Sequence, residues 1–450
     1  MSRKECGNVK TSKITVSILL ILLMIAGWTC GLLGIMDGSE KEAGAMTNYK
    51  KCIELAEDYS RRGLYQKAIV QYENAVSARN EEADWEALME SYEKRYKESD
   101  DILEDYITAA KKAVDAYGNA GFYKKLTELC LEKDDYSTAC RYLGRALNAG
   151  IEDESLKELY EEVRYACELD NRYYLSIQSM CNGNYPVSSQ GQWGLLSQKN
   201  KLTVKCQYDF IGHVSEEGIY LFTNENMSGL MDMEELLQGK FTFTPEDAGI
   251  YSEGLIAVKD KNSWAYYDLL GDKQIGDYQA AGTFQDGKAA VNTGDGWVLI
   301  NPDGEIVSDT YEEIRLNPDG TYLKNDIMLA KQDGSWHLYD EKEKRTGDFF
   351  CDEIDIVTDD NMIAFEKDGQ WGFVNSEGTV VIEPAYEQAK SFSEGLAAVY
   401  VDNWWGFINE ENRLVIDASY LNVDYFNEEG SCMVQTAGDT WQLLKRHVNE

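Results

Sequence analysis

A tryptophan that returns about every 35 residues constrains the fold of this 450-residue chain more than any other feature. One interval is twice as long, and its middle holds Ser228-Gly229-Leu230, a copy of the unit that lacks the indole. Periods of this size are typical of propellers, solenoids and repeat arrays, so the spacing predicts about eight structural units. The repeated motif positions are Trp193, Gly194, Trp264, Trp297, Trp336, Trp371, Gly372, Trp405, Gly406 and Trp441.

The composition of each unit predicts short strands joined by tight turns. In the clearest unit, Phe392 to Val399 precedes Trp405 to Asn409, and Leu414-Val415-Ile416 follows. These runs are apolar, aromatic or β-branched, and the Gly, Asn and Asp residues between them favour hairpin turns. One such unit cannot bury its own apolar face, so we expect neighbouring units to pack together with the tryptophan at the shared interface.

The glycine that follows the tryptophan has a separate structural explanation. A position without Cβ lets another backbone approach closely, which predicts a close contact at residues 194, 372 and 406. The requirement is loose, because other units place larger residues there. These are Ala265, Val298, His337 and Gln442.

The repeated pattern resembles the WG-repeat proteins of bacteria, in which Phe-x-x-Gly-x-x-x-Val precedes Trp-Gly and a turn. Phe284 to Val291 before Trp297, and Phe392 to Val399 before Trp405, carry the resemblance, which extends over residues 185–450. It implies a β-propeller of short blades and no agreed activity, so no site residues follow from it. An open β-solenoid is the alternative. Strand-forming residues 174–190 precede the first unit, an offset that would permit both ends to share one blade.

Residues 47–172 show a helical period instead. Apolar and small residues recur on one face, as in Ala68, Tyr72 and Ala75, and a second start reads Trp85-x-x-Leu88-Met89-x-x-Tyr92. This order resembles the tetratricopeptide repeat. A generic antiparallel helical array is the alternative. The change to strands falls between residues 170 and 190.

The N-terminus predicts a membrane anchor. Residues 1–13 are basic, and residues 14–36 form an uncharged apolar run. At about 1.5 Å per residue this run can cross a hydrocarbon core of about 30 Å. The positive side is N-terminal, which predicts a cytoplasmic tail, a single-pass helix and extracytoplasmic domains in the bacterial cell envelope. Cleavage near Ala43-Gly44-Ala45 and lipidation at Cys30 are the alternatives.

The predicted fold class is therefore multidomain. A cytoplasmic tail (residues 1–13) and a transmembrane helix (14–36) are followed by a linker (37–46), a tetratricopeptide-like helical array (47–172) and an all-β, propeller-like repeat domain (173–450).

Composition excludes several classes of function. With 80 acidic and 43 basic residues, the formal net charge is −37, and such a surface repels the phosphates of nucleic acids. The ten cysteines form no Cys-x-x-Cys pair, and none clusters with the three histidines. We therefore expect no zinc site, no other metal site and no cofactor.

No catalytic motif is present, so we expect a binding protein and not an enzyme. The first hypothesis is a membrane-tethered extracytoplasmic scaffold that binds unidentified protein partners through a helical-repeat groove and a face of the β-repeat domain. The alternative is a receptor for a cell-wall glycan or small ligand that uses rim aromatics, for which Tyr400 and Trp404 are the candidates. Trp404 precedes Trp405, and strand alternation would turn the two rings to opposite faces.

Overall fold

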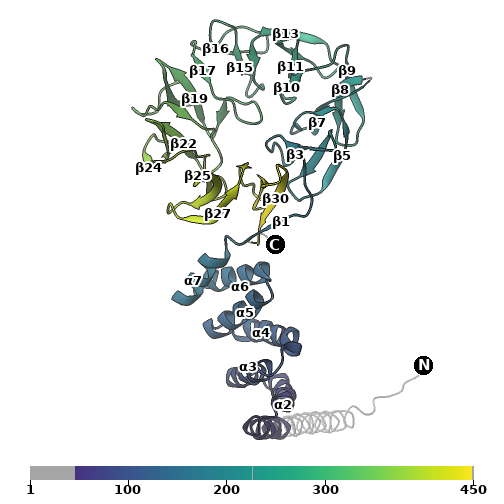
Figure 1. The fold of residues 1–450 in the computed structure, drawn as a ribbon, viewed down its shortest axis with the longest axis vertical. Helices are drawn as coiled ribbons and strands as arrows, with labels where there is room; N and C mark the ends of the chain where they lie inside the picture. Colours follow the sequence, from purple (N-terminus) through teal and green to yellow (C-terminus); the bar gives the residue numbers. More distant parts are fainter. Residues whose placement is uncertain (1–45, 226, 448–450) are drawn as a thin grey trace, which may run out of the picture. The chain divides into compact units, whose positions relative to one another are not determined.

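The computed structural model describes residues 46–225 and 227–447. Contacts within the chain divide it after Tyr160 into two compact units, and each is described by itself. The first unit is helical and the second consists of β-sheets (Figure 1).

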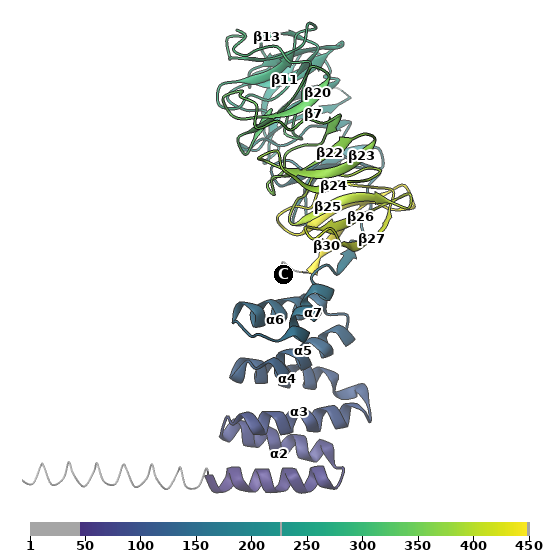
Figure 2. The ribbon, with the colours of Figure 1, turned by 90° about the vertical axis from the view of Figure 1, so that its left-hand side faces the viewer.

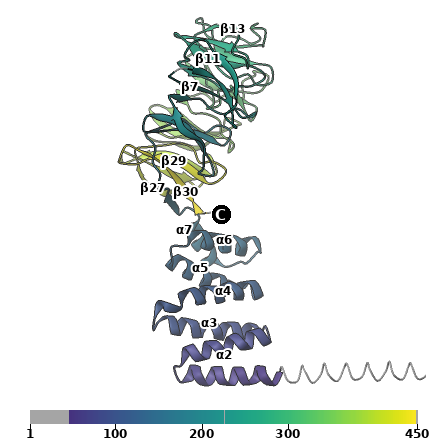
Figure 3. The same cartoon turned by 90° about the vertical axis from the view of Figure 1, so that its right-hand side faces the viewer.

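The helical unit is a succession of helices joined by short turns (Figures 2 and 3). The helix Leu103–Tyr117 ends at Gly118, which has the left-handed conformation with φ of 56°. Glycine adopts this conformation without a Cβ penalty. Asn119 caps the next by accepting a hydrogen bond from the backbone N–H of Phe122 at 2.9 Å. Residues 46–61 are helical, and the further elements are α2 (Tyr65–Ala78), α3 (Glu82–Tyr96), the short η1 (Asp100–Ile102), α4 (Leu103–Tyr117), α5 (Ala120–Glu132), α6 (Tyr136–Asn148) and α7 (Glu154–Val163).

Small residues let these helices pack closely. Ala68, Ala75, Ala113 and Ala139 are fully buried. Larger rings fill the space between α3 and α4, where Tyr92 and Tyr106 stack with their centroids 5.3 Å apart. The helical period of the sequence therefore corresponds to helices that pack in chain order, each of α2 to α5 against the next one in the chain.

The second unit is an eight-bladed β-propeller built of antiparallel sheets (Figure 1). The first four blades are β2 (Ser176–Ile177), β3 (Asn184–Ser189), β4 (Gln192–Ser197) and β5 (Leu202–Tyr208); β6 (Phe210–Ile211), β7 (Ile219–Asn224), β8 (Met227–Asp232) and β9 (Leu237–Phe241); β10 (Asp247–Ala248), β11 (Ile256–Asp260), β12 (Ser263–Tyr267) and β13 (Lys273–Tyr278); and β14 (Ala280–Ala281), β15 (Ala289–Asn292) and β16 (Trp297–Ile300).

The last four blades complete the ring. They are β17 (Glu313–Ile314), β18 (Leu323–Lys324), β19 (Ile327–Gln332) and β20 (Ser335–Tyr339); β21 (Glu353–Ile354), β22 (Met362–Lys367), β23 (Gln370–Asn375) and β24 (Val380–Tyr386); β25 (Leu396–Val401), β26 (Trp404–Asn409) and β27 (Leu414–Tyr420); and β28 (Asn422–Val423), β29 (Ser431–Gln435), β30 (Trp441–Arg446) and β1 (Cys167–Leu169).

The core of the propeller lies between blades. Each apolar cluster draws its buried side chains from two successive blades, as where Leu195 of the first blade packs with Phe222 of the second. Another joins Met433 and Leu443 of the eighth blade to Tyr185 of the first. The ring is therefore closed by side chains, and the open solenoid is ruled out.

Strand pairing also closes the ring. β1 pairs antiparallel with β30, with Cys167 opposite Arg446 and Leu169 opposite Leu444. The pairing continues at Tyr174, whose backbone N–H donates to the carbonyl of Trp441 at 2.8 Å. Residues from both ends of the propeller thus share the eighth blade, as the sequence offset permitted, although the shared strand begins earlier than residue 174.

The glycine after the tryptophan is explained by the outermost strand of the blade. A Cβ added at Gly372 would lie 2.5 Å from the carbonyl oxygen of Ile382, and one at Gly406 would lie 2.8 Å from Cα of Ala418. Ala265 is tolerated because Gly276 stands opposite it in β13. In the fourth and fifth blades, where Val298 and His337 replace the glycine, the outer strand is reduced to isolated bridges.

One part of the predicted fold class and the predicted localisation are corrected. Within residues 46–225 and 227–447, no helix is long and apolar enough to cross a membrane. The structure therefore does not support a single-pass protein of the cell membrane with a cytoplasmic N-terminus and extracytoplasmic domains. The predicted tail (1–13) and span (14–36), Cys30 and residues 43–45 lie outside the described residues, as does the linker 37–46 apart from its last residue.

Candidate functional site

The tryptophans of the repeat are parts of the inter-blade cores. Trp336 is fully buried and Trp405 is 7% exposed. The others are half-buried and pack against the cluster between their own blade and a neighbouring one. They are Trp193, Trp264, Trp297, Trp371 and Trp441. These side chains stabilise the ring and do not form an exposed row.

The two candidate rim aromatics do not form one binding platform. Tyr400 pairs with Trp405 across β25 and β26, and their rings meet edge to face at a centroid distance of 5.6 Å. Tyr400 also packs against the cluster between the seventh and eighth blades. Trp404 is half-buried and pairs with Val401, so it lies on the opposite face of the sheet from Tyr400.

One backbone hydrogen bond recurs in all eight blades. Its donor is the N–H of a residue that lies just after the innermost strand, and its acceptor is a carbonyl of the next strand in the blade. Three of these positions, in the second to fourth blades, are glycines. The fifth to eighth blades instead carry charges of alternating sign. In blade order the residues are Gln178, Gly212, Gly249, Gly282, Arg315, Asp355, Lys390 and Asp424, with N···O distances of 2.8–2.9 Å.

Three of these charged residues surround Tyr425. Its hydroxyl donates to both carboxylate oxygens of Asp355, at 2.8 and 2.7 Å. Lys390 lies over its ring, with Nζ 5.0 Å from the centroid. The charge of Arg315, which is ion-paired with Glu353, also acts on the tyrosine. Burial, followed by the charge of Asp355, raises the pKa of Tyr425 well above its ordinary value, so the hydroxyl remains a hydrogen-bond donor at neutral pH.

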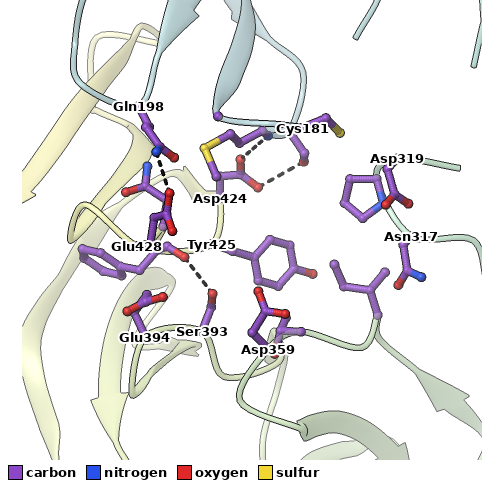
Figure 4. A pocket seen from close by; sticks show the side chains of 18 of the residues that line it. Cys181, Gln198, Asn317, Asp319, Asp359, Ser393, Glu394, Asp424, Tyr425 and Glu428 are labelled. Carbon is purple, nitrogen blue, oxygen red and sulfur yellow. Dashed lines mark hydrogen bonds between the residues drawn. The ribbon is translucent and has the colours of Figure 1, made fainter. Parts of the chain in front are cut away.

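Asp424 and Tyr425 line a cavity of about 440 Å³, which we call the central pocket (Figure 4). Its walls come from loops of the first and the fifth to eighth blades. Backbone and uncharged side chains form much of the lining. The charged lining residues are Asp319, Lys324, Asp359, Glu394, Asp424 and Glu428.

Asp424 is the buried acid of the central pocket, at 4% exposure. It accepts hydrogen bonds from the Ser179 hydroxyl at 3.1 Å and from the Met180 backbone N–H at 3.4 Å (Figure 4). Burial raises the pKa of its carboxyl, and the nearby charge of Lys390 opposes that shift.

The mouth of the central pocket is acidic. Burial raises the pKa of Glu394, and the neighbouring carboxylates of Asp360, Asp359 and Glu428 add to the shift. Lys324 is the lysine of the lining and is held 3.1 Å from Asp359. Glu428 accepts a hydrogen bond from the Gln198 amide at 2.7 Å (Figure 4).

The helical unit contains a second cavity, of about 540 Å³, which we call the helical groove. Its floor is buried and apolar, and Trp85, Leu88 and Tyr92 of α3 belong to it. Its rim is exposed and polar. The rim residues are Glu73 and Ser77 of α2 and Asp105, Thr108 and Lys112 of α4.

No group of three or more metal-binding side chains occurs among residues 46–225 and 227–447. His337 is buried and its Nδ1 lies 3.1 Å from the Phe349 carbonyl, where it belongs to the packing of the fifth blade. Burial lowers the pKa of His213 to about 4, so this histidine is uncharged at neutral pH. In the described part of the chain, the free thiols include Cys52, Cys130, Cys167, Cys181, Cys206, Cys351 and Cys432.

The sequence predicts a helical-repeat groove and places Trp85, Leu88 and Tyr92 in a repeat, but it does not identify them as lining residues, and it misses the central pocket entirely. For the central pocket a signal exists in the repeat itself. The charged position lies two residues before the phenylalanine of the repeat, as Lys390 does before Phe392 and Asp424 before Phe426. The alternation of charge becomes visible only when the eight units are aligned in this way.

The comparisons with known proteins agree with the repeat. Residues 193–227, 371–403 and 405–441 match the family model described as "WG containing repeat". No curated protein matches the chain.

Two solved structures illustrate the remaining similarity. "Crystal Structure of Mitotic Checkpoint Complex" aligns with 61% of this chain and 93% of that one, at 9% identity and a TM-score of 0.32. "TPR2B-domain:pHsp70-complex of yeast Sti1" aligns with 25% of this chain and 94% of that one, at 14% identity and a TM-score of 0.20. Neither similarity is high enough to carry an argument. The family model shows that this propeller carries WG repeats. Each matched segment runs from the tryptophan strand of one blade into the next blade.

Proposed function

We propose that this protein is a non-catalytic interaction protein whose helical groove holds an extended segment of a protein partner, while the propeller provides a second interaction domain. The observation that carries the proposal is the composition of the groove. An apolar floor of largely buried side chains lies beneath a polar rim that carries both signs of charge. Such a floor gives affinity to apolar side chains of a peptide, and the rim gives direction to its polar groups.

The floor of the groove is held in place before any partner binds. The indole N–H of Trp85 donates to the Asn80 side chain at 2.6 Å, and the hydroxyl of Tyr92 donates to Glu73 at 2.8 Å. Side chains that are already ordered lose little conformational entropy on binding, which favours recognition of a flexible segment.

The glycan-receptor alternative has no comparable site, because its two candidate residues, Tyr400 and Trp404, lie on opposite faces of their sheet. The net charge of −37 disfavours a nucleic-acid partner. The sequence contains no catalytic motif, which favours binding over catalysis.

Site-specific photo-crosslinking in cells that express the full chain tests the proposal. A photoreactive amino acid replaces Thr108 in the groove, and in a control protein it replaces Glu86, which is exposed on α3 outside the groove. We expect one discrete crosslinked protein from position 108 and none from position 86. The crosslink should disappear when Lys112→Trp fills the neighbouring rim position.

Equal crosslinking from both positions, or none from position 108, would refute a partner in the groove. The variants at residues 86, 108 and 112 should all keep the circular dichroism spectrum of the wild type, because these three residues are exposed.

A further inference from the structure

We propose that the central pocket of the propeller binds an organic cation with a primary ammonium group, present either in a free diamine or in the lysine side chain of a peptide. This site lies wholly within the propeller, so it stands or falls independently of the helical groove.

The first step is the charge of the lining. Five carboxylates and one ammonium group line the central pocket, whereas the whole chain has 80 acidic and 43 basic residues. The pocket is therefore more acidic than the general surface of the protein. Its single lysine, Lys324, is already paired with Asp359 at 3.1 Å. Burial, followed by the like charges of its neighbours, raises the pKa of Glu394, and a cation bound at the mouth would relieve the repulsion between these carboxylates.

The second step is the state of Asp424. Among the described residues, no lysine, arginine or histidine forms an ion pair with this carboxyl, although it is only 4% exposed. Its two hydrogen bonds, at 3.1 and 3.4 Å, leave acceptor capacity on both oxygens. The charge of Lys390 acts on this buried carboxyl from nearby but forms no ion pair with it. An ammonium group with three N–H donors would supply a direct charge partner and further hydrogen bonds.

The third step is the shape and the neutral part of the lining. A volume of about 440 Å³ is within the range of small-ligand sites. The aromatic ring of Tyr425 lies beside the carboxylates (Figure 4). Lys390 already lies over this ring, with Nζ 5.0 Å from its centroid, so the ring offers the ligand an apolar wall and not a free cation site. The hydrogen bonds from the Tyr425 hydroxyl to Asp355 hold that ring in place.

The five carboxylates of the lining do not form a group that could hold a metal ion, which fits an extended organic cation better. No cluster of three metal ligands occurs in the described part of the chain, in agreement with this choice.

Isothermal titration calorimetry of the full chain at low ionic strength tests the proposal with two probes. Cadaverine represents a free diamine, and Nα-acetyl-lysine methylamide represents a peptide side chain. We expect saturable binding of one probe per chain for at least one of them. The Nε-acetylated form of the lysine probe, which is uncharged, should bind at least tenfold more weakly. Tighter binding of cadaverine would assign the site to free diamines, and tighter binding of the lysine probe would assign it to a peptide.

Three variants locate the binding. Asp424→Asn and Glu394→Gln should each weaken it about tenfold or more, because each removes one charge-assisted contact. Glu410→Gln removes the same charge from an exposed turn outside the pocket and should bind as the wild type does. Glu394 is exposed, so its variant remains informative even if Asp424→Asn disturbs folding. The absence of saturable binding by both probes, or equal binding by all three variants, would overturn the proposal.

Discussion

Replacing Gly372 by alanine tests the physical reason for the second half of the Trp-Gly motif. The new Cβ would lie 2.5 Å from the carbonyl oxygen of Ile382 and 2.7 Å from the backbone nitrogen of Pro384. Both atoms belong to the backbone of β24, so no side-chain rotation can relieve the contact. The strand itself must move away from β23. Overpacking of this kind costs about 1–3 kcal/mol.

Thermal unfolding of the full chain, followed by tryptophan fluorescence, measures the effect. At about 2–4 °C per kcal/mol, the expected decrease in the midpoint of the propeller transition is about 2–12 °C. Gly438→Ala is the matched control, because its Cβ would meet nothing closer than the Thr440 hydroxyl at 3.8 Å and its backbone is not left-handed. A midpoint for Gly372→Ala within 1 °C of the wild type, or an equal decrease in the control, would refute the reasoning.

Three further predictions follow from ring closure, from a buried histidine and from the thiols. Tyr174→Ala removes a 4%-exposed ring at the junction of the first and eighth blades and should destabilise the propeller by about 3–5 kcal/mol, measured by denaturant unfolding. Because burial lowers the pKa of His213 from 6.5 to about 4, the folded state resists its protonation, so stability should be lost as pH falls from 6.5 through 4. A His213→Gln variant should show a flatter stability profile over that range, and an unchanged profile would contradict this assignment. Burial raises the pKa of the Cys181 and Cys432 thiols, so these cysteines should react with a disulfide reagent at pH 8 at least tenfold more slowly in the native than in the unfolded protein, as followed by mass spectrometry of labelled peptides. Equal labelling in both states would show that they are accessible.

The repeat in the sequence was sufficient to predict the number of blades, because each blade must present one large apolar side chain to its neighbour. Even the unit at Ser228, which has lost its indole, keeps Gly229 and forms β8 in the second blade. The closure of the ring was not decided by the repeat. It depends on the pairing of Cys167 with Arg446, two positions that no local pattern relates.

The candidate sites were harder to predict for a physical reason. The sequence predicts that Tyr400 and Trp404 are exposed candidates, but exposure depends on the neighbouring blade, and Tyr400 packs against Trp405. The central pocket forms where loops from five blades meet, so its acids are far apart in sequence, from Asp319 to Glu428. The apolar run of residues 14–36 predicts a membrane helix, but these residues lie outside the described part of the chain, and none of the described helices is long and apolar enough to cross a bilayer.

The strand that closes the ring also sets the order in which the protein can be completed during synthesis. Asp170 and Gln442, which share a hydrogen bond beside β1, are 272 residues apart in the chain. At a translation rate of about 5–20 residues per second, β1 leaves the ribosome about 15–55 s before its partner strand is made. During that interval the nascent propeller has an unpaired edge and an uncovered first blade, both of which invite pairing with other chains. A chaperone that shields this edge, or slow release of the nascent chain, would therefore affect the yield of folded protein more than its final stability.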